Sequence, residues 1–212
     1  GTSAIDALGV LTKGQLLVGQ TAADPTALAI DTDGYVLTLD SAQAAGVKWA
    51  VTGASGVQPI FTCRPMDATF PTTNFPQLLK NAGTNQVDYT LDYDQTTSEA
   101  AFWQFFIPST AVFTTATIKI ASRQAAATSG TAGWTVTTLT RSNGQAWDTA
   151  GNADTVTAAT VPGTAGLVQL FSQALTVTGW AAGETLIVKI ARDVADTVAE
   201  DVKLMVAEIE LA

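Results

Sequence analysis

One aromatic and polar loop offers the clearest chemistry in this chain. The segment QAWDTAGNAD, residues 145–154, places Trp147 beside Asp148 and Asn152 among small residues. A flat indole ring packs on the apolar face of a sugar, while carboxylate and amide groups hydrogen-bond its hydroxyls. These three residues are therefore predicted to bind a ligand, with carbohydrate as its class. The alternative is that Trp147 folds back over the edge of its domain.

The other tryptophans of the C-terminal part separate by their sequence context. Trp180, in VTGWAAGE, is the second candidate for an exposed stacking ring. Trp103 and Trp134 lie in strand-like apolar runs. We therefore expect these two to belong to a hydrophobic core.

Two acidic runs contain ligand types that suit a calcium ion. They supply Asp92, Asp94 and Glu99 in LDYDQTTSE, and Asp193, Asp196, Glu200 and Asp201 in ARDVADTVAED. Neither run has the spacing and central glycine of an EF-hand. Acidic loop residues also commonly serve as turn formers, so a structural calcium stays an alternative and no cofactor is predicted. The adjacent Arg192 and Asp193 are expected to form a salt bridge or a turn clamp.

The residue inventory argues against catalysis. The chain of 212 residues has no histidine, which removes the usual general base and the Ser-His and Cys-His pairs. The single cysteine, Cys63, is interpreted as a small apolar side chain. Paired carboxylates serve glycoside hydrolysis, but nothing in the sequence places two of them across a cleft. A non-enzymatic protein is predicted, and a glycan-degrading enzyme is the distant alternative.

Charge and hydropathy exclude several partners. The formal net charge is -9 and the ten basic residues are scattered, which argues against nucleic acid and against an anionic membrane surface. No apolar run reaches the length of a membrane span, so we expect no membrane insertion. The start of the chain lacks the basic, apolar pattern of a signal peptide, and synthesis in a cytosol is expected.

Period-two alternation predicts strands through most of the chain. In VDYTLDY, residues 87–93, apolar and polar side chains alternate strictly. Similar runs recur at intervals to residue 211, and Asn143-Gly144 is a hairpin signal between two of them. Eight or nine short strands without helical periods favour a β-sandwich of the jelly-roll type over a meander. The predicted fold class is all-β.

Residues 53–84 differ in composition. Four of the seven prolines occur there, which favours a semi-rigid connector lying on a surface, with Phe61, Met66, Phe70 and Phe75 as its apolar anchors. FPQLLKN, residues 75–81, predicts a short helix because a proline lies in its first turn and Gly83 follows its end.

The first 52 residues contain four very short apolar runs, QLLV, TALAI, YVLTL and VKWAV. Strands this short bury too little apolar surface to offset their conformational entropy. Large groups such as Leu37, Leu39 and Trp49 still require a cover. The same segment from sister chains around a common axis would supply it and would hide the strand edges. Residues 1–11 are compatible with a helical turn or an extended tail.

This N-terminal part resembles a segment that recurs in tail-fibre and other virion proteins of tailed bacteriophages. The match lies in KGQLLVGQ at 13–20, Pro25 and Leu28, TDGYVLTLDS at 32–41 and GVKWA at 46–50. Asp31 and Tyr35 stand where the family form has Gly and Gln, and neither change alters strand polarity. The resemblance implies a trimeric protein on the surface of the virion. The C-terminal part resembles, in architecture only, β-sandwich tips of phage fibres and carbohydrate-binding modules.

The sequence thus predicts three parts, listed by residue: a short-strand stem or attachment segment, 1–52, a proline-rich connector, 53–84, and a β-sandwich head, 85–212. The expected function is that of a homotrimeric bacteriophage fibre or spike whose head binds the host surface, with glycan as ligand. The alternative is a capsid head fibre or decoration protein that packs on other virion proteins. Localisation on the particle is expected, after synthesis in the host cytoplasm.

Overall fold

The structure is a computed structural model that describes residues 15–18, 26–29, 35–42, 46–51, 59–193 and 195–212. The chain divides into two compact units, Gly1–Val57 and Gln58–Ala212. Residues 1–11, for which a helical turn or an extended tail was expected, lie outside the described residues. No helix among the described residues is long and apolar enough to cross a membrane.

The first unit consists of two small antiparallel sheets. Their strands are β1, Leu16–Val18, β2, Thr26–Leu28, β3, Tyr35–Leu39, and β4, Val47–Val51, paired as β1-β2 and β3-β4. The Trp49 indole nitrogen donates to the carbonyl of Ala29 at 2.7 Å and so links β4 to the residue after β2. None of the described side chains in this unit is buried, and Leu39 is 91% exposed.

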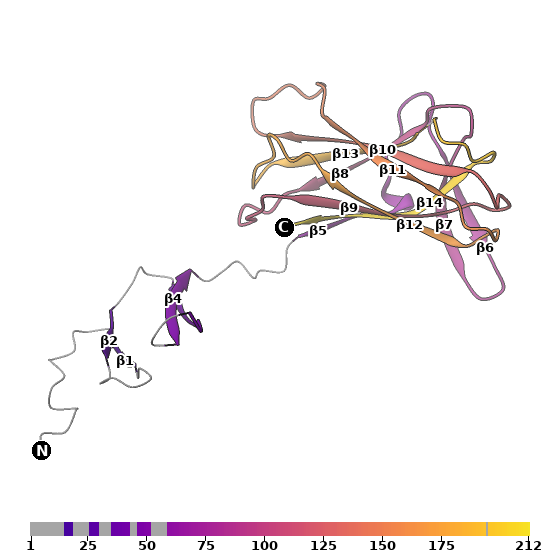
Figure 1. The fold of residues 1–212 in the computed structure, drawn as a ribbon. Helices are drawn as coiled ribbons and strands as arrows, with labels where there is room; N and C mark the ends of the chain where they lie inside the picture. Colours follow the sequence, from indigo (N-terminus) through magenta and orange to yellow (C-terminus); the bar gives the residue numbers. More distant parts are fainter. Residues whose placement is uncertain (1–14, 19–25, 30–34, 43–45, 52–58, 194) are drawn as a thin grey trace, which may run out of the picture. The chain divides into compact units, whose positions relative to one another are not determined.

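The second unit is a sandwich of two antiparallel sheets (Figure 1). Its strands are β5, Ile60–Cys63, β6, Gln77–Ala82, β7, Val87–Tyr93, β8, Ala100–Phe106, β9, Ala116–Arg123, β10, Thr131–Arg141, β11, Asn152–Thr160, β12, Val168–Leu175, β13, Thr185–Arg192, and β14, Val202–Leu211. One sheet has the order β11-β10-β13-β8, and the other β12-β9-β14-β7-β6 with β5 beside β14. A short 3-10 helix, η2, spans Pro65–Asp67.

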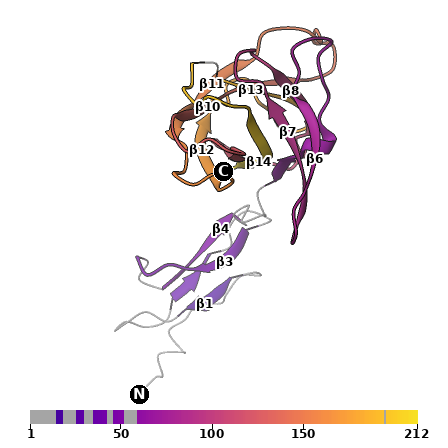
Figure 2. The ribbon, with the colours of Figure 1, turned by 90° about the vertical axis from the view of Figure 1, so that its right-hand side faces the viewer.

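The strand pairing is nested, which identifies the topology. β7 pairs with β14, β8 with β13, β9 with β12 and β10 with β11, all antiparallel. A chain that pairs first with last and second with next-to-last is a long double strand folded over into two layers, as in a jelly roll. Figure 2 shows the two layers after a quarter turn. The predicted all-β, jelly-roll-like sandwich is confirmed.

The core between the sheets follows the period-two patterns. Trp134 is fully buried and packs edge-to-face on Tyr93, with ring centroids 5.1 Å apart. Trp103 is buried too, and its indole nitrogen donates to the carbonyl of Arg64 at 2.8 Å. Both tryptophans were predicted to be core residues, and this is confirmed. Cys63 is free and fully buried, and burial raises the pKa of its thiol.

The helix predicted over residues 75–81 is wrong, because residues 77–81 belong to β6. β6 lies antiparallel to β7, so that Leu78 faces Leu91, and the Asn81 amide donates to the Thr90 hydroxyl at 2.9 Å. A single short helix has too few hydrogen bonds to persist by itself. The otherwise open edge of β7 offers the same backbone groups a full set of partners.

The described part of the predicted connector, residues 59–84, supplies β5, η2 and β6 to the sandwich unit. Its prolines all lie outside the strands, as their missing N–H requires. Phe61 is buried, whereas Met66, Phe70 and Phe75 remain exposed. Phe70 and Phe75 contact each other, with ring centroids 5.7 Å apart. The prolines of this segment therefore lie in the gaps between the strands.

Candidate functional site

The outer face of the four-stranded sheet carries ordered rows of side chains. Strand register aligns Phe102 of β8, Lys189 of β13 and Thr137 of β10 in one row. The next row contains Gln104, Ile187 and Leu139 from the same three strands. Because side chains alternate along a strand, all six point away from the core. They form a floor in which apolar and hydrogen-bonding groups are mixed.

The loop between β10 and β11 forms a wall beside this floor. Residues 142–151 leave β10 through a turn at Gly144, which has φ +84°. The loop then returns close over β10, so that a Cβ at Gly151 would lie 2.4 Å from the Thr138 carbonyl oxygen. Only glycine allows this approach of backbone to backbone. The end of the loop is therefore held against the backbone of β10.

Floor and wall enclose a cleft of about 410 Å³. Trp147, Asp148 and Thr149 line one side, and Thr69 lines it as well. Thr69 is fixed to β8 by two backbone hydrogen bonds with Phe102, of 2.8 and 2.9 Å. The Trp147 side chain is 64% exposed, which is unusual for the largest apolar side chain.

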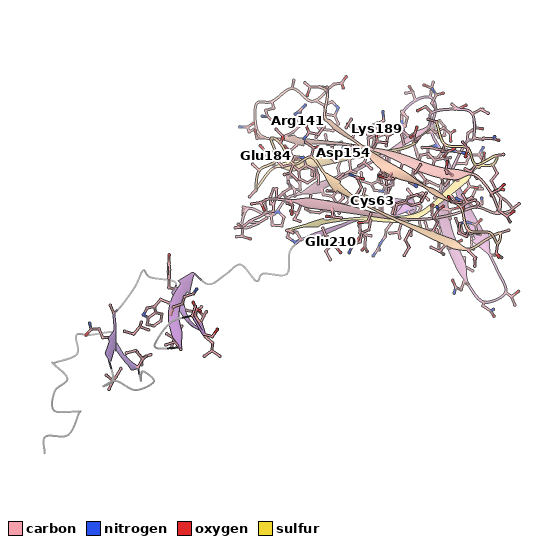
Figure 3. All side chains as sticks on the ribbon, viewed as in Figure 1. Cys63, Arg141, Asp154, Glu184, Lys189 and Glu210 are labelled. Carbon is pink, nitrogen blue, oxygen red and sulfur yellow. The ribbon has the colours of Figure 1, made fainter. Side chains whose placement is uncertain are left out.

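A second hollow of about 360 Å³ lies on the same face and shares Trp147 with the cleft. Its floor is the third row of the sheet, Phe106, Thr185 and Arg141, and residues of the 142–145 turn close it. Trp147 therefore lies at the junction of two adjoining depressions. Figure 3 shows Arg141 and Lys189 on the side of the sandwich formed by the four-stranded sheet.

The structure brings two of the three predicted ligand-binding residues together. Trp147 and Asp148 both line the cleft. Asn152 does not line it, because its amide donates to the backbone carbonyls of Thr176 and Thr178 at 3.0 and 2.9 Å. These bonds attach the start of β11 to the loop that follows β12. Asn152 thus has a structural contact that no pattern in the sequence indicated.

Trp180, the second candidate for stacking, packs toward the interior. It is half-buried against the core and makes an edge contact with Phe113, with centroids 6.3 Å apart. Its indole nitrogen is buried without a partner. Trp147 is accordingly the exposed indole of the described part of the sandwich unit.

Acidic residues of the first run serve the 94–97 turn. Asp94 accepts hydrogen bonds from the backbone N–H groups of Thr96 and Thr97, at 2.7 and 2.8 Å, and these bonds lower the pKa of its carboxyl. Glu99 accepts from the Asp94 N–H at 2.7 Å. Partial burial, with repulsion from Asp94 and Asp201, raises the pKa of Glu99.

The second acidic run is built around Arg192, which is buried. Its guanidinium donates twice to Asp196, at 2.8 and 3.0 Å, and also to the carbonyls of Tyr93, Val198 and Glu200. The expected salt bridge at this turn exists, but the partner is Asp196 and not Asp193, whose carboxylate accepts from Ala195 N–H. No three acidic, histidine or cysteine side chains among the described residues are placed to share a metal ion.

The cleft floor was missed by sequence reasoning. Gln104, Ile187 and Lys189 lie in runs that predict strands and carry no signal beyond alternation. They are neighbours only because β8, β13 and β10 are adjacent in the folded sheet. Strand order depends on contacts between distant parts of the sequence, so these residues can be identified as cleft residues only from the structure.

No protein-family model and no curated protein matches this chain. Among solved structures, this chain is similar to a CBM35 from Cellvibrio japonicus, at 14% identity over 71% of this chain and 92% of that chain, with a TM-score of 0.45. A family 35 carbohydrate binding module from Clostridium thermocellum gives 12% identity over 73% and 99%, with a TM-score of 0.42. A carbohydrate binding module from Cellvibrio mixtus lichenase 5A, in complex with cellotriose, gives 11% over 72% and 97%, with a TM-score of 0.41.

Proposed function

We propose that this chain is a non-enzymatic surface protein of a bacteriophage virion whose sandwich binds carbohydrate in the cleft beside Trp147. The observation that carries the binding role is the exposed indole of Trp147 at the rim of a cleft with a mixed floor. Burying this ring against a ligand removes more apolar area from water than any other exposed side chain of the cleft offers. Gln104, Thr137 and Lys189 supply donors and acceptors for hydroxyl groups.

Carboxylate geometry favours binding over hydrolysis. Glycosidases place two carboxylic groups across the scissile bond. Among the described residues that line the cleft, Asp148 is the one carboxylate. It offers hydrogen bonds to a sugar but has no acidic partner across the cleft to act with it. This supports a binding role.

The first unit supports assembly with sister chains. Its described strands expose Leu16, Leu17 and Leu37 at about two fifths of their surface, and Leu39 almost completely. Large apolar side chains left exposed in this way are candidates for a contact surface. Together with the resemblance of residues 13–50 to a virion segment, this exposure favours a homotrimeric attachment segment. Particle location follows from the same resemblance.

The binding role is tested on a glycan array that includes bacterial surface polysaccharides. We expect the full chain to bind a defined subset and Trp147→Ala to lose that binding. Leu170→Ala is the matched control, because Leu170 is comparably exposed but lies on β12 of the other sheet. Failure of the full chain to bind any glycan, together with its co-purification with capsids, would favour the alternative of a decoration protein that packs on other virion proteins.

A further inference from the structure

We propose that the ligand of the Trp147 cleft is an acidic polysaccharide, whose anionic substituents are bound by Lys189 and Arg141. This inference rests on the proposed carbohydrate-binding function and specifies the class of glycan. It concerns both depressions on the four-stranded sheet, because Lys189 lines the cleft and Arg141 lines the adjoining hollow.

Two unpaired basic side chains of the sandwich unit lie on this face. Four of the eight basic side chains of the unit pair with carboxylates, as Lys119–Glu210, Arg123–Asp88, Arg192–Asp196 and Lys203–Asp92. The other four, Arg64, Lys80, Arg141 and Lys189, form no ion pair with the described residues. Two of these four line the depressions that share Trp147. A chain with a formal net charge of -9 thus presents unneutralised positive charge at its candidate site.

Arg141 has hydrogen-bonding capacity that the described residues leave unused. One guanidinium nitrogen, Nη1, donates to the carbonyl of the preceding Thr140 at 2.8 Å. Nε and Nη2 are buried and have no partner, although buried donors are almost always bonded. A carboxylate fits a guanidinium edge with two parallel hydrogen bonds. Nε and Nη2 form the edge of Arg141 that has the capacity to bind such a group.

A carboxylate of the protein is a competing partner for Arg141. Glu184 follows Gly183, which lines the same hollow, and its Oε2 is also buried without a hydrogen bond. No nitrogen of Arg141 lies within 4.0 Å of a carboxylate oxygen among the described residues. Arg141 therefore forms no direct ion pair with Glu184. If water connects the two side chains, the unfolding temperature of Arg141→Gln will reveal it.

The separation of the two cations indicates a polymeric ligand. Lys189 lies opposite Thr137, and Arg141 is four residues further along β10. At ~3.3 Å per residue, this places the two positions roughly 13 Å apart along the strands. One sugar ring does not span that distance, whereas a chain of linked rings does. Asp148 at the rim repels anions, so the charged substituents are expected toward the two cations, with an uncharged ring face on Trp147.

Titration calorimetry of the full chain with matched polymers tests the proposal. The probes are a polyuronate, the same polymer after carboxyl reduction, and a sulfated and an unsulfated dextran. We expect the polyuronate to bind at least about ten-fold more tightly than its reduced form, because a hydrogen bond to a charged group contributes at least this much. Binding should weaken as sodium chloride rises. Tighter binding of the sulfated dextran would identify sulfate as the preferred anion, and tighter binding of the polyuronate would identify carboxylate.

Substitutions separate the roles of the two cations. Lys189→Gln and Arg141→Gln should each reduce polyuronate affinity by about ten-fold and should reduce affinity for the reduced polymer by much less. Lys80→Gln is the control, since Lys80 is unpaired but lies on β6, outside both depressions. If Arg141 instead serves Glu184, Arg141→Gln lowers the unfolding temperature without changing the preference for acidic polymer, which overturns its assigned role.

The outcomes distinguish this inference from the proposed function. Equal affinity for acidic and reduced polymers, with loss of both in Trp147→Ala, overturns the acidic preference and leaves carbohydrate binding standing. Absence of binding to all four polymers and to the glycan array overturns both.

Discussion

Arg192 and Asp196 form a two-bond ion pair inside the sandwich, and both side chains are almost completely withdrawn from solvent. The remaining guanidinium donors bond to backbone carbonyls, so no donor of Arg192 is left without an acceptor. The pair joins the end of β13 to the loop between β13 and β14. Burial of the charged guanidinium is tolerated here because a carboxylate neutralises it and every one of its N–H groups has an acceptor.

Asp196→Asn is therefore expected to lower the free energy of unfolding by about 3–5 kcal/mol, since it leaves the buried guanidinium without its counter-ion. Chemical denaturation of the full chain measures this. Glu210→Gln is the matched control. It breaks the exposed Lys119–Glu210 pair and should cost less than about 1 kcal/mol. Equal small effects of the two substitutions would show that the buried pair has no special role.

Truncation of two tryptophans of this chain should lower the free energy of unfolding to very different extents. Trp134→Ala removes a fully buried ring and is expected to destabilise the sandwich by about 3–5 kcal/mol. Trp147→Ala removes a largely exposed ring and should change stability by no more than about 0.5 kcal/mol. Thermal unfolding of the two variants makes the comparison. A large loss in Trp147→Ala would mean that this ring supports the fold and is not held free for a ligand.

Local patterns in the sequence predicted the sandwich well, because alternation of apolar and polar side chains is a property of each strand alone. Residues 87–93 and 116–122 form strands as expected, and the buried positions of Trp103 and Trp134 follow from the same period. The helix predicted at 75–81 was wrong because pairing with the free edge of β7 outweighed the local helix signals. β7 is held in the sheet by its pairing with β14, which is a long-range contact that the local sequence does not reveal.

The candidate site was predicted only in part. An isolated Trp and Asp in a polar loop stand out in a sequence, and Trp147 and Asp148 do share the cleft. Asn152 has the same composition signal, but its amide is bonded to the loop after β12. Lys189 carries no signal, because its place beside Phe102 and Thr137 depends on the order of strands that are far apart in sequence.

Gly151 should be required for the loop that carries Trp147. In Gly151→Ala the added Cβ would lie 2.4 Å from the Thr138 carbonyl oxygen, a contact with backbone that cannot move freely. We expect a loss of stability of about 1–3 kcal/mol from this overpacking, with weaker glycan binding because the wall shifts. In Gly163→Ala the Cβ would meet no atom within 4 Å, so this control should be near neutral. The account of the loop is contradicted if both variants unfold and bind alike.

The raised pKa of Glu99 gives stability a defined pH dependence. The folded state holds this proton more tightly than the unfolded state, so the contribution of Glu99 to stability is present at low pH and is lost as pH rises through its raised pKa. Glu99→Gln, which retains an acceptor for the Asp94 N–H, should therefore gain stability relative to wild type between about pH 4 and pH 7. The gain is expected to stay below about 1 kcal/mol, since Glu99 is only half-buried. A difference that shrinks with rising pH would refute the assigned shift, and urea titrations at both pH values decide.

The exposed apolar groups of β1 and β3 lead to a prediction about assembly. Light scattering of the full chain should give three times the mass of one chain, because three copies together cover these groups. Leu37→Asp should reduce the mass toward that of one chain, since it places a charge on the surface expected to be covered. Leu170→Asp, on β12 of the sandwich, is the control and should remain trimeric. A monomeric full chain would remove the physical support for a trimeric attachment segment.

Carbohydrate binding at Trp147 is tested most directly by the indole N–H signals in a nitrogen-15 correlation spectrum of the full chain. The chain has five tryptophans, and the Trp147 signal is assigned by its absence in Trp147→Phe. On titration with a glycan that binds, the Trp147 signal should shift with saturation while those of Trp103, Trp134 and Trp180 stay in place. Saturation by the glycan with an unmoved Trp147 signal, or with shifts at Trp180 instead, would contradict the site proposed for this protein.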